Sequence, residues 1–320
     1  MRRARLAETH PTGPRVTDAT LSSDPEQNRL NANLFCVAAM MVWAVGFPMV
    51  AQLLPVMSPL ALTAARLALG ALSLLFFWLA LEGAGTLARA PWRRGMLIGM
   101  IGFGAGAYLM VVAQSLTDGV TVAITSSALP IIGIGLECLL DGRRLTLALV
   151  AGLALSLMGG LVTYANGIGH LHVGLGAGAV LLSTGLYCWA SRETVKGLPG
   201  LSPLGQTAIT LAGASLATAT AYGITALWFG TGVDTAAFDW RHMGYLALYG
   251  FGSLAVSQML WIIGVGRLGV GIASLHINAA PFYVMLLFAL GGAGWNPVQL
   301  LGALIVGAGV LIAQGRGRST

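Results

Sequence analysis

The feature that most constrains this chain is a series of long apolar runs separated by short polar gaps. A bilayer core about 30 Å thick is crossed by about 20 apolar residues in an α-helix. Runs of that length cover residues 32–52, 59–81, 95–116, 119–140, 145–165, 173–191, 203–229, 242–264, 269–290 and 297–314. Only 9% of the residues are charged, so lipid must surround much of the chain. We therefore predict an all-α integral membrane protein with ten transmembrane helices.

The positions of the basic residues predict the orientation of these helices. If the N-terminus lies in the cytoplasm, fifteen of the 17 Lys and Arg residues fall in cytoplasmic segments. The outer loops then hold only Arg241, and Arg66 lies inside a span. Cytoplasmic loops of membrane proteins carry an excess of Lys and Arg. The pattern therefore predicts both termini in the cytoplasm of a multi-pass protein of the cell (inner) membrane.

Several classes of function find no support in the sequence. The net charge of +6 comes from residues in the gaps rather than from a basic face with interleaved aromatics, so we expect no nucleic-acid partner. Cys36, Cys138 and Cys188 lie in apolar runs without metal-ligand spacing, so we expect no metal and no cofactor. The chain has no HExxH motif, nucleophile elbow or phosphate-binding loop with Lys. We predict that it is not an enzyme.

An internal repeat divides the chain into two halves. Gly119, Pro130, Gly152 and Gly159 recur as Gly269, Pro281, Gly302 and Gly309. Five spans are an odd number, so the second half would enter the membrane with opposite polarity, as in many secondary transporters. We expect a disordered basic cytoplasmic tail, a first five-helix repeat, a second five-helix repeat and a short cytoplasmic tail. Their expected ranges are 1–31, 32–165, 173–314 and 315–320.

Short stretches in both halves resemble a known family. They are Trp43–Pro48, Pro59 with Arg66 and Gly70, Ala123 to Pro130, Arg144–Thr146, Gly152 to Gly160, Pro281, and Gln299–Gly302 with Gly307 to Gly309. Together they resemble the drug/metabolite transporter superfamily, specifically its EamA-type ten-span branch, over residues 32–314. The chain departs from that pattern at Arg143, where the family often has Glu, and at Thr184, where it often has Trp. The resemblance implies secondary transport, commonly export, of amino acids or related metabolites.

Two charged residues inside the spans are candidates for charge recognition or coupling. Arg66 could attract a substrate carboxylate, or it could snorkel to the outer interface and bond neighbouring carbonyls. Glu137 could be a coupling carboxylate, or it could pair with Arg143 or Arg144 at the membrane surface. Sequence alone leaves both pairs of alternatives open.

A second group of candidates surrounds the prolines of the fourth and ninth spans. His276 and Asn278 precede Pro281, which frees a backbone carbonyl one turn earlier, and Ser126 precedes Pro130. These groups could form a solute site, and an imidazole could sense protons. They could equally form hydrogen bonds that hold neighbouring helices together.

Amides and aromatics form a third group. Gln114 and Gln258 occupy related places in the third and eighth spans. The aromatic residues near them are Tyr108 and Trp261, and Trp43 lies one turn before Pro48 in the first span. Such a set suits a small organic molecule with an apolar body and polar ends, although lipid-facing aromatics would give the same pattern. We expect Tyr187 and Trp189 to belong to an interfacial belt instead.

Together these features predict a secondary transporter that moves a small, amino-acid-like metabolite, in the direction of export, by alternating access. We expect the helix breaks at Pro48, Pro130 and Pro281 to belong to its mechanism. The alternatives are a non-transporting membrane scaffold or sensor, and an intramembrane enzyme. The expected partners are the small-molecule substrate and the lipid bilayer. Small-residue ridges in the fifth and tenth spans leave a homodimer open.

Overall fold

The computed structural model describes residues 25–116, 125–163, 174–279, 282–283, 286 and 297–314. Within them the chain is helical, with one isolated antiparallel β-bridge between Met57 and Val233. Most of the two expected tails, 1–24 and 315–320, lies outside the described residues. The first helix begins at Pro25, so the last part of the expected N-terminal tail is helical. Arg29 and Asn33 of this helix bond Gln314, which gives it a partner that the sequence did not indicate.

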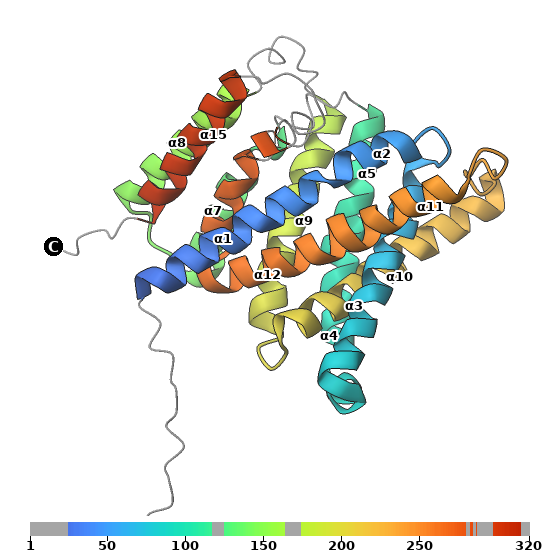
Figure 1. The fold of residues 1–320 in the computed structure, drawn as a ribbon. Helices are drawn as coiled ribbons and strands as arrows, with labels where there is room; N and C mark the ends of the chain where they lie inside the picture. Colours follow the sequence, from blue (N-terminus) through green and yellow to red (C-terminus); the bar gives the residue numbers. More distant parts are fainter. Residues whose placement is uncertain are drawn as a thin grey trace, which may run out of the picture.

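The first half of the chain supplies a helix within each of its expected apolar runs. The elements are α1 (Pro25–Ala44), α2 (Gly46–Leu53), α3 (Pro59–Arg89), α4 (Trp92–Ile98), the π-helical η1 (Gly99–Gly104), α5 (Ala105–Leu116), α7 (Leu129–Asp141) and α8 (Leu147–Thr163). Trp92 to Leu116 is one continuous helical path with η1 in its middle (Figure 1).

The second half follows the same plan. Its elements are α9 (Leu175–Gly197), α10 (Pro203–Phe229), α11 (Trp240–Ala247), the π-helical η3 (Leu248–Val256), α12 (Ser257–Leu268), α13 (Val270–Ser274), the 3₁₀-helical η4 (Leu275–Ala279) and α15 (Pro297–Ala313). The continuous path through α11, η3 and α12 carries a π-helical segment in its middle, like its counterpart in the first half.

Among the described residues, four helices are long and apolar enough to cross a membrane. They are Gln27–Val50, Pro59–Arg89, Pro203–Phe229 and Trp240–Leu268. Shorter apolar helices cover Leu147–Val162, Val270–Ala279 and Leu300–Ala313. The prediction of an all-α integral membrane protein is therefore confirmed at this level, and the count of ten spans stays a prediction.

Two long helices begin with the same local chemistry. Ser58 caps α3 by accepting a hydrogen bond from the Ala61 amide (3.3 Å), and Ser202 caps α10 from the Gly205 amide (3.1 Å). A proline follows each serine, where its missing N–H costs no intrahelical bond. These two starts fix where α3 and α10 enter the bundle.

The helices of the two halves pack against one another rather than forming separate bundles. α3 contacts α10, α7 contacts α13, and α8 lies along α15 (Figure 1). α1 packs on α12, and α5 packs correspondingly on α9. Likewise η3 lies on α3, while η1 lies on α10. Each contact either joins equivalent helices or has an equivalent contact in the other half.

The glycines of the predicted repeat form the contact between α8 and α15. A Cβ atom on Gly309 would lie 2.7 Å from the carbonyl oxygen of Gly152, and one on Gly159 would lie 2.6 Å from that of Gly302. Only residues without a side chain allow helix backbones to approach so closely. The two glycine pairs therefore meet each other in antiparallel order.

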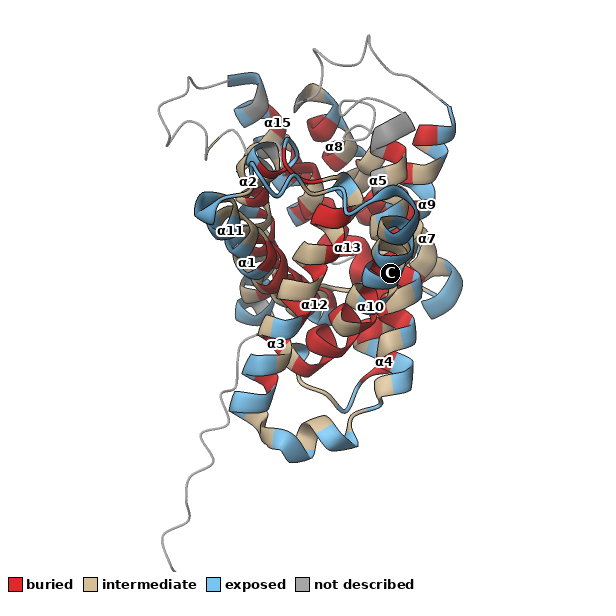
Figure 2. Ribbon diagram, turned by 90° about the vertical axis from the view of Figure 1, so that its right-hand side faces the viewer, coloured by how far each residue is buried: buried red, intermediate tan, exposed pale blue. Residues whose placement is uncertain are grey.

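The two ends of the bundle differ. Leu53, Val56, Met57, Ala61 and Leu62 form an apolar cluster with Tyr222, Val233, Phe238, Tyr245 and Tyr249. We call this the apolar end, and we call the opposite end, with Arg29, Arg143, Arg144, Arg192 and Arg267, the basic end. Between them, buried residues gather on the inner faces of α10, α12 and α13 (Figure 2).

Candidate functional site

A buried cluster of aromatic and polar side chains joins the two halves in the interior. Tyr187 of α9 donates its hydroxyl hydrogen to the side-chain oxygen of Gln258 in α12 (3.0 Å). Trp261 donates from its indole to Ser191 (3.0 Å), and the Tyr187 ring lies 5.9 Å from Trp261 and 5.3 Å from Phe103 of η1. We call these five residues the aromatic cluster. They bring η1, α9 and α12 to one place.

The amide of Gln258 is only half satisfied in this cluster. Its oxygen accepts from Tyr187, but its nitrogen is buried and has no hydrogen-bond partner among the described residues. A buried donor without a partner costs about 1–3 kcal/mol. Such a group is therefore ready to bond an acceptor that enters the site.

Tyr187 corrects one expectation from the sequence. Its hydroxyl group reaches the buried Gln258 and its ring packs on Trp261, so it does not belong to an interfacial belt. The position near the end of a span suggested the belt, because aromatics often lie at that depth. Contacts with η1 and α12 hold the Tyr187 side chain inward instead. The local sequence of α9 does not predict these contacts.

Arg66 lies against the aromatic ring of Tyr249. Its guanidinium carbon is 4.6 Å from the centre of the Tyr249 ring, and one terminal nitrogen donates to the Tyr249 hydroxyl. Its Nε atom is buried without a hydrogen-bond partner among the described residues. Arg66 is thus the second buried donor with spare capacity, and it faces η3 of the other half.

The break in the first span lies close to this arginine. The helix is interrupted at Val45, between α1 and α2, and Pro48 occupies the first turn of α2. The Trp43 carbonyl, released by the break, accepts a hydrogen bond from Ser253 of η3 (3.0 Å). A side chain on Gly46 would meet Tyr249. The predicted break therefore gives η3 a close approach to the first span.

Asn278 and His276 lie in η4, where the ninth span tightens into a 3₁₀ helix. Asn278 donates to the carbonyl and hydroxyl oxygens of Ser156 in α8 (3.3 and 3.0 Å), and its own oxygen is buried without a partner in the described chain. The Nδ1 atom of His276 lies 3.1 Å from the Ala273 carbonyl oxygen. These bonds fit the interhelical alternative for Asn278, while its free oxygen leaves room for a ligand.

The remaining candidates are not gathered at one place. Tyr108 is 46% exposed, whereas Trp261 is 1% exposed. Ser126 is half-buried, and a turn follows it before α7 begins around Pro130. The side chain of Gln114 and all of Pro281 lie outside the described residues. The structure thus brings together Gln258 and Trp261 and leaves the predicted partnership with Gln114 and Tyr108 untested.

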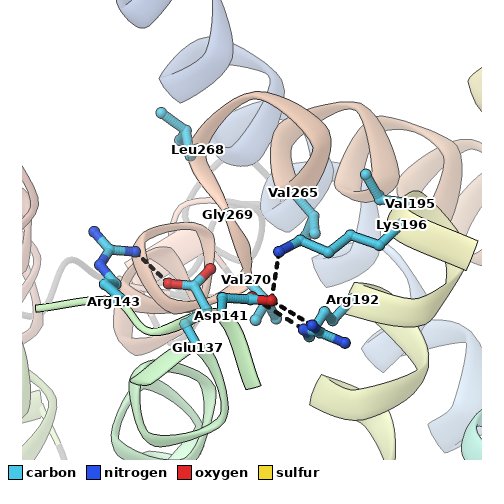
Figure 3. Close-up of a pocket in the computed structure, with 10 residues that line it drawn as sticks. All are labelled: Glu137, Asp141, Arg143, Arg192, Val195, Lys196, Val265, Leu268, Gly269 and Val270. Atoms are coloured by element: carbon cyan, nitrogen blue, oxygen red, sulfur yellow. Dashed lines mark hydrogen bonds and ion pairs between the residues drawn. The ribbon is translucent and has the colours of Figure 1, made fainter. Parts of the chain in front are cut away.

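Glu137 lines a cavity of about 330 Å³ at the basic end (Figure 3). Its carboxylate points toward Arg143 and pairs with it, which is the surface-pair alternative foreseen from the sequence. Figure 3 shows Asp141 on the same wall, between Arg192 and Lys196 of α9. Lys196 is 2.5 Å from Asp141, and the Arg192 Nε atom is 3.0 Å from it.

These ion pairs connect the first half to the second. The hydrogen bond from Arg192, aided by Lys196, lowers the pKa of Asp141 to about 2. The same carboxylate, together with Glu193, raises the pKa of the Arg192 guanidinium. The Asp141 carboxylate therefore stays ionised at neutral pH and holds α7 to α9 at the mouth of the cavity.

Comparison with known proteins gives three findings. Residues 30–165 match the EamA-like transporter family. The chain is 24% identical over 226 residues to the "Uncharacterized transporter YyaM" of Bacillus subtilis (strain 168), covering 68% of this chain and 71% of that protein. A solved structure titled "Crystal structure of protein" has a TM-score of 0.75 at 20% identity, covering 91% of this chain and all of that one, and shares its fold.

Proposed function

We propose, from the match of residues 30–165 to the EamA-like transporter family, that the protein exports a small amino-acid-like metabolite by alternating access. We place it in the cell (inner) membrane with ten spans, both termini and the basic end in the cytoplasm. In this proposal, residues 32–165 and 173–314 are inverted five-helix repeats. That the protein is a membrane transporter follows from the family, and the finer statements are proposals.

The packing of equivalent helices supports the inverted repeats. An inverted pair has two arrangements of similar energy, open to opposite sides of the membrane. The pairs α3 with α10, α7 with α13 and α8 with α15 each join helices at the same place in the two halves. The π-helical segments η1 and η3 also occupy matching places, and π-helical turns often mark functional sites.

The substrate class rests on two buried donors, which are the observation that carries the proposal. The Arg66 Nε and Gln258 Nε2 atoms are both buried without an acceptor in the described chain. Both suit a carboxylate, which accepts hydrogen bonds only. The aromatic cluster beside Gln258 offers ring faces to an apolar body. An amino acid with an apolar side chain has both of these parts.

Flux measurements on proteoliposomes that contain only this protein test the proposal. A panel of radiolabelled amino acids and their metabolites is loaded, and efflux is compared with that from protein-free liposomes. We expect flux for carboxylate-bearing members with apolar side chains. No flux for any member of the panel would favour the scaffold or sensor.

Gln258→Leu removes the unpaired donor and sharpens the test. We expect the KM of the transported solute to rise about tenfold or more, because a hydrogen bond to a charged group contributes about 1.5–3 kcal/mol. Gln206→Leu is the matched control, because Gln206 is also a buried amide but already donates to the Leu198 carbonyl (2.9 Å). That change should lower stability and leave the KM unchanged.

Transport could be coupled to protons through Glu137 or His276, or it could be uncoupled facilitated diffusion. The ion pair with Arg143 favours a facilitator without coupling at Glu137. Flux in Glu137→Gln and His276→Ala variants, measured with and without a pH gradient, separates the two models. Unchanged gradient dependence in both variants would eliminate coupling by these groups.

A further inference from the structure

A second cavity at the basic end is lined by arginines. It has a volume of about 360 Å³, and its charged lining residues are Arg29, Arg143, Arg144 and Arg267. They come from α1, from the segment after α7 and from the last turn of α12. No carboxylate is among the described residues that line it. Four arginine residues from distant parts of the chain therefore line one hollow.

In the part of the chain that the structure describes, most of this positive charge has no acidic partner. Arg143 pairs with Glu137, but the Arg29 side chain bonds the neutral carbonyl of Gln314, and Arg267 lies over the ring of Phe35 at 4.8 Å. Within the described ranges, Arg144 and Arg267 make no ion pair. In the neighbouring cavity, by contrast, Asp141 bonds both of the cations beside it.

We infer that this arginine cavity binds a phosphate group. A guanidinium presents a planar fork of donors that matches the oxygens of a phosphate, and converging forks match a group with several oxygens. Basic pockets between membrane helices at the level of the cytoplasmic surface recognise anionic lipid headgroups. The phosphate can therefore come from an anionic phospholipid or from a soluble phosphate, and the experiment distinguishes these two sources.

The inference does not depend on transport. The cavity is lined by none of the residues of the aromatic cluster, nor by Arg66 or Asn278. Binding is measured on the purified full chain without any flux, so its failure would leave the proposed function untouched.

The test follows thermal unfolding of the purified chain in a neutral detergent while one probe is added. The probes are phosphatidylglycerol, phosphatidylcholine and inorganic phosphate. We expect phosphatidylglycerol or phosphate to raise Tm and phosphatidylcholine to have no effect. A response to the lipid alone identifies a headgroup site, and a response to inorganic phosphate identifies a site for soluble phosphates.

Two double variants decide whether the cavity carries the response. Arg144→Gln with Arg267→Gln should weaken the effective probe about 25-fold, because each arginine near an anionic surface contributes about five-fold. Arg89→Gln with Arg93→Gln removes the same charge from exposed residues outside the cavity and should respond like the unchanged protein.

The double variant Arg144→Lys with Arg267→Lys is a control for misfolding. It keeps both positive charges but loses the planar donor geometry of the guanidinium groups. We expect intermediate affinity. Equal responses in the Arg144 and Arg89 double-glutamine variants would overturn the inference, because the effect would then be general surface charge. A lack of response to both phosphatidylglycerol and inorganic phosphate in the unchanged protein would overturn it as well.

Discussion

The two ends of the bundle are held together by different forces. At the apolar end, the Ser58 amide donates to the Gly232 carbonyl (2.6 Å), the Asp234 amide donates to the Val56 carbonyl (2.9 Å), and apolar side chains fill the space around them. At the basic end, Asp141 and its two cations join the halves beside open cavities of about 330 and 360 Å³. Backbone hydrogen bonds and apolar packing close the apolar end, whereas ion pairs join the two halves at the basic end.

This difference bears on how readily each end can separate. Ion pairs at a wet surface contribute little and exchange readily with water. Packed apolar side chains with backbone bonds separate only as a unit. The two cavities lie at the basic end, and under the proposed alternating access the apolar end would part in another state.

Locking the apolar end should have the largest effect. Met57 and Val233 form an antiparallel bridge, whose Cα separation of about 4.5–5.5 Å suits a disulfide. Met57→Cys with Val233→Cys, in a chain whose three native cysteines are replaced, should reduce flux on oxidation to the level of protein-free liposomes. Reduction should restore it, and either cysteine alone should have no effect. Full flux through the oxidised protein would show that transport does not require this end to open.

Loosening the same end should produce the next largest effect. Gly232 has a φ of +62°, and a Cβ atom there would lie 2.5 Å from the Ser58 hydroxyl oxygen. Gly232→Ala should lower the unfolding free energy by at least about 2 kcal/mol, through backbone strain and this clash. Gly142 also has a positive φ, in the left-handed helical region, but open space around it, so Gly142→Ala should cost only about 1 kcal/mol. Equal unfolding midpoints in denaturant would refute the packing of Ser58 on Gly232.

The smallest effect is expected at the basic end, and it should depend on pH. Asp141→Asn should lower the unfolding free energy by about 1 kcal/mol at pH 7, because the ion pairs are partly exposed. The folded chain holds the pKa of Asp141 at about 2, below its ordinary 3.8, so this stability is present above about pH 4. It should disappear as the pH falls from about 4 to about 2. A difference between variant and native protein that persists unchanged to pH 2 would contradict the assignment.

Much of the fold could be predicted because the membrane imposes simple rules on sequence. An apolar run must be long enough to cross lipid, and it must form helix to satisfy its backbone. Each predicted run accordingly contains helix in the described residues, and α10 has the predicted bounds, 203–229. The start of α1 at Pro25 was missed because its first turns are polar and are held by Gln314, far along the chain.

A further repeat between the two halves lies in the sequence. Ser58-Pro59-Leu60 recurs as Ser202-Pro203-Leu204, and Thr63 and Leu67 recur at the same offset as Thr207 and Leu211. This match starts the second and seventh predicted spans. This match between the two halves is clearer than the match of the glycines, because it needs no gap.

The candidate site was less predictable than the fold. Residue type alone predicts Gln258 and Trp261, and the structure unites them with Tyr187, for which the sequence predicts an interfacial belt. Side-chain partners across helices depend on rotation and crossing of those helices, which apolar periodicity does not specify. For the same reason Arg66 could not be matched to Tyr249, although both residues stand in predicted spans.

The meeting of Gly152 with Gly309, and of Gly159 with Gly302, bears on how such a chain could arise. Gly309 is the counterpart of Gly159, and Gly302 is the counterpart of Gly152, so the surface that one half presents is the surface that it meets. If the halves are inverted copies, a single five-helix ancestor inserted in both orientations would already have formed this contact with its twin. Gene duplication and fusion would then have had to supply only a linker between partners that already fitted.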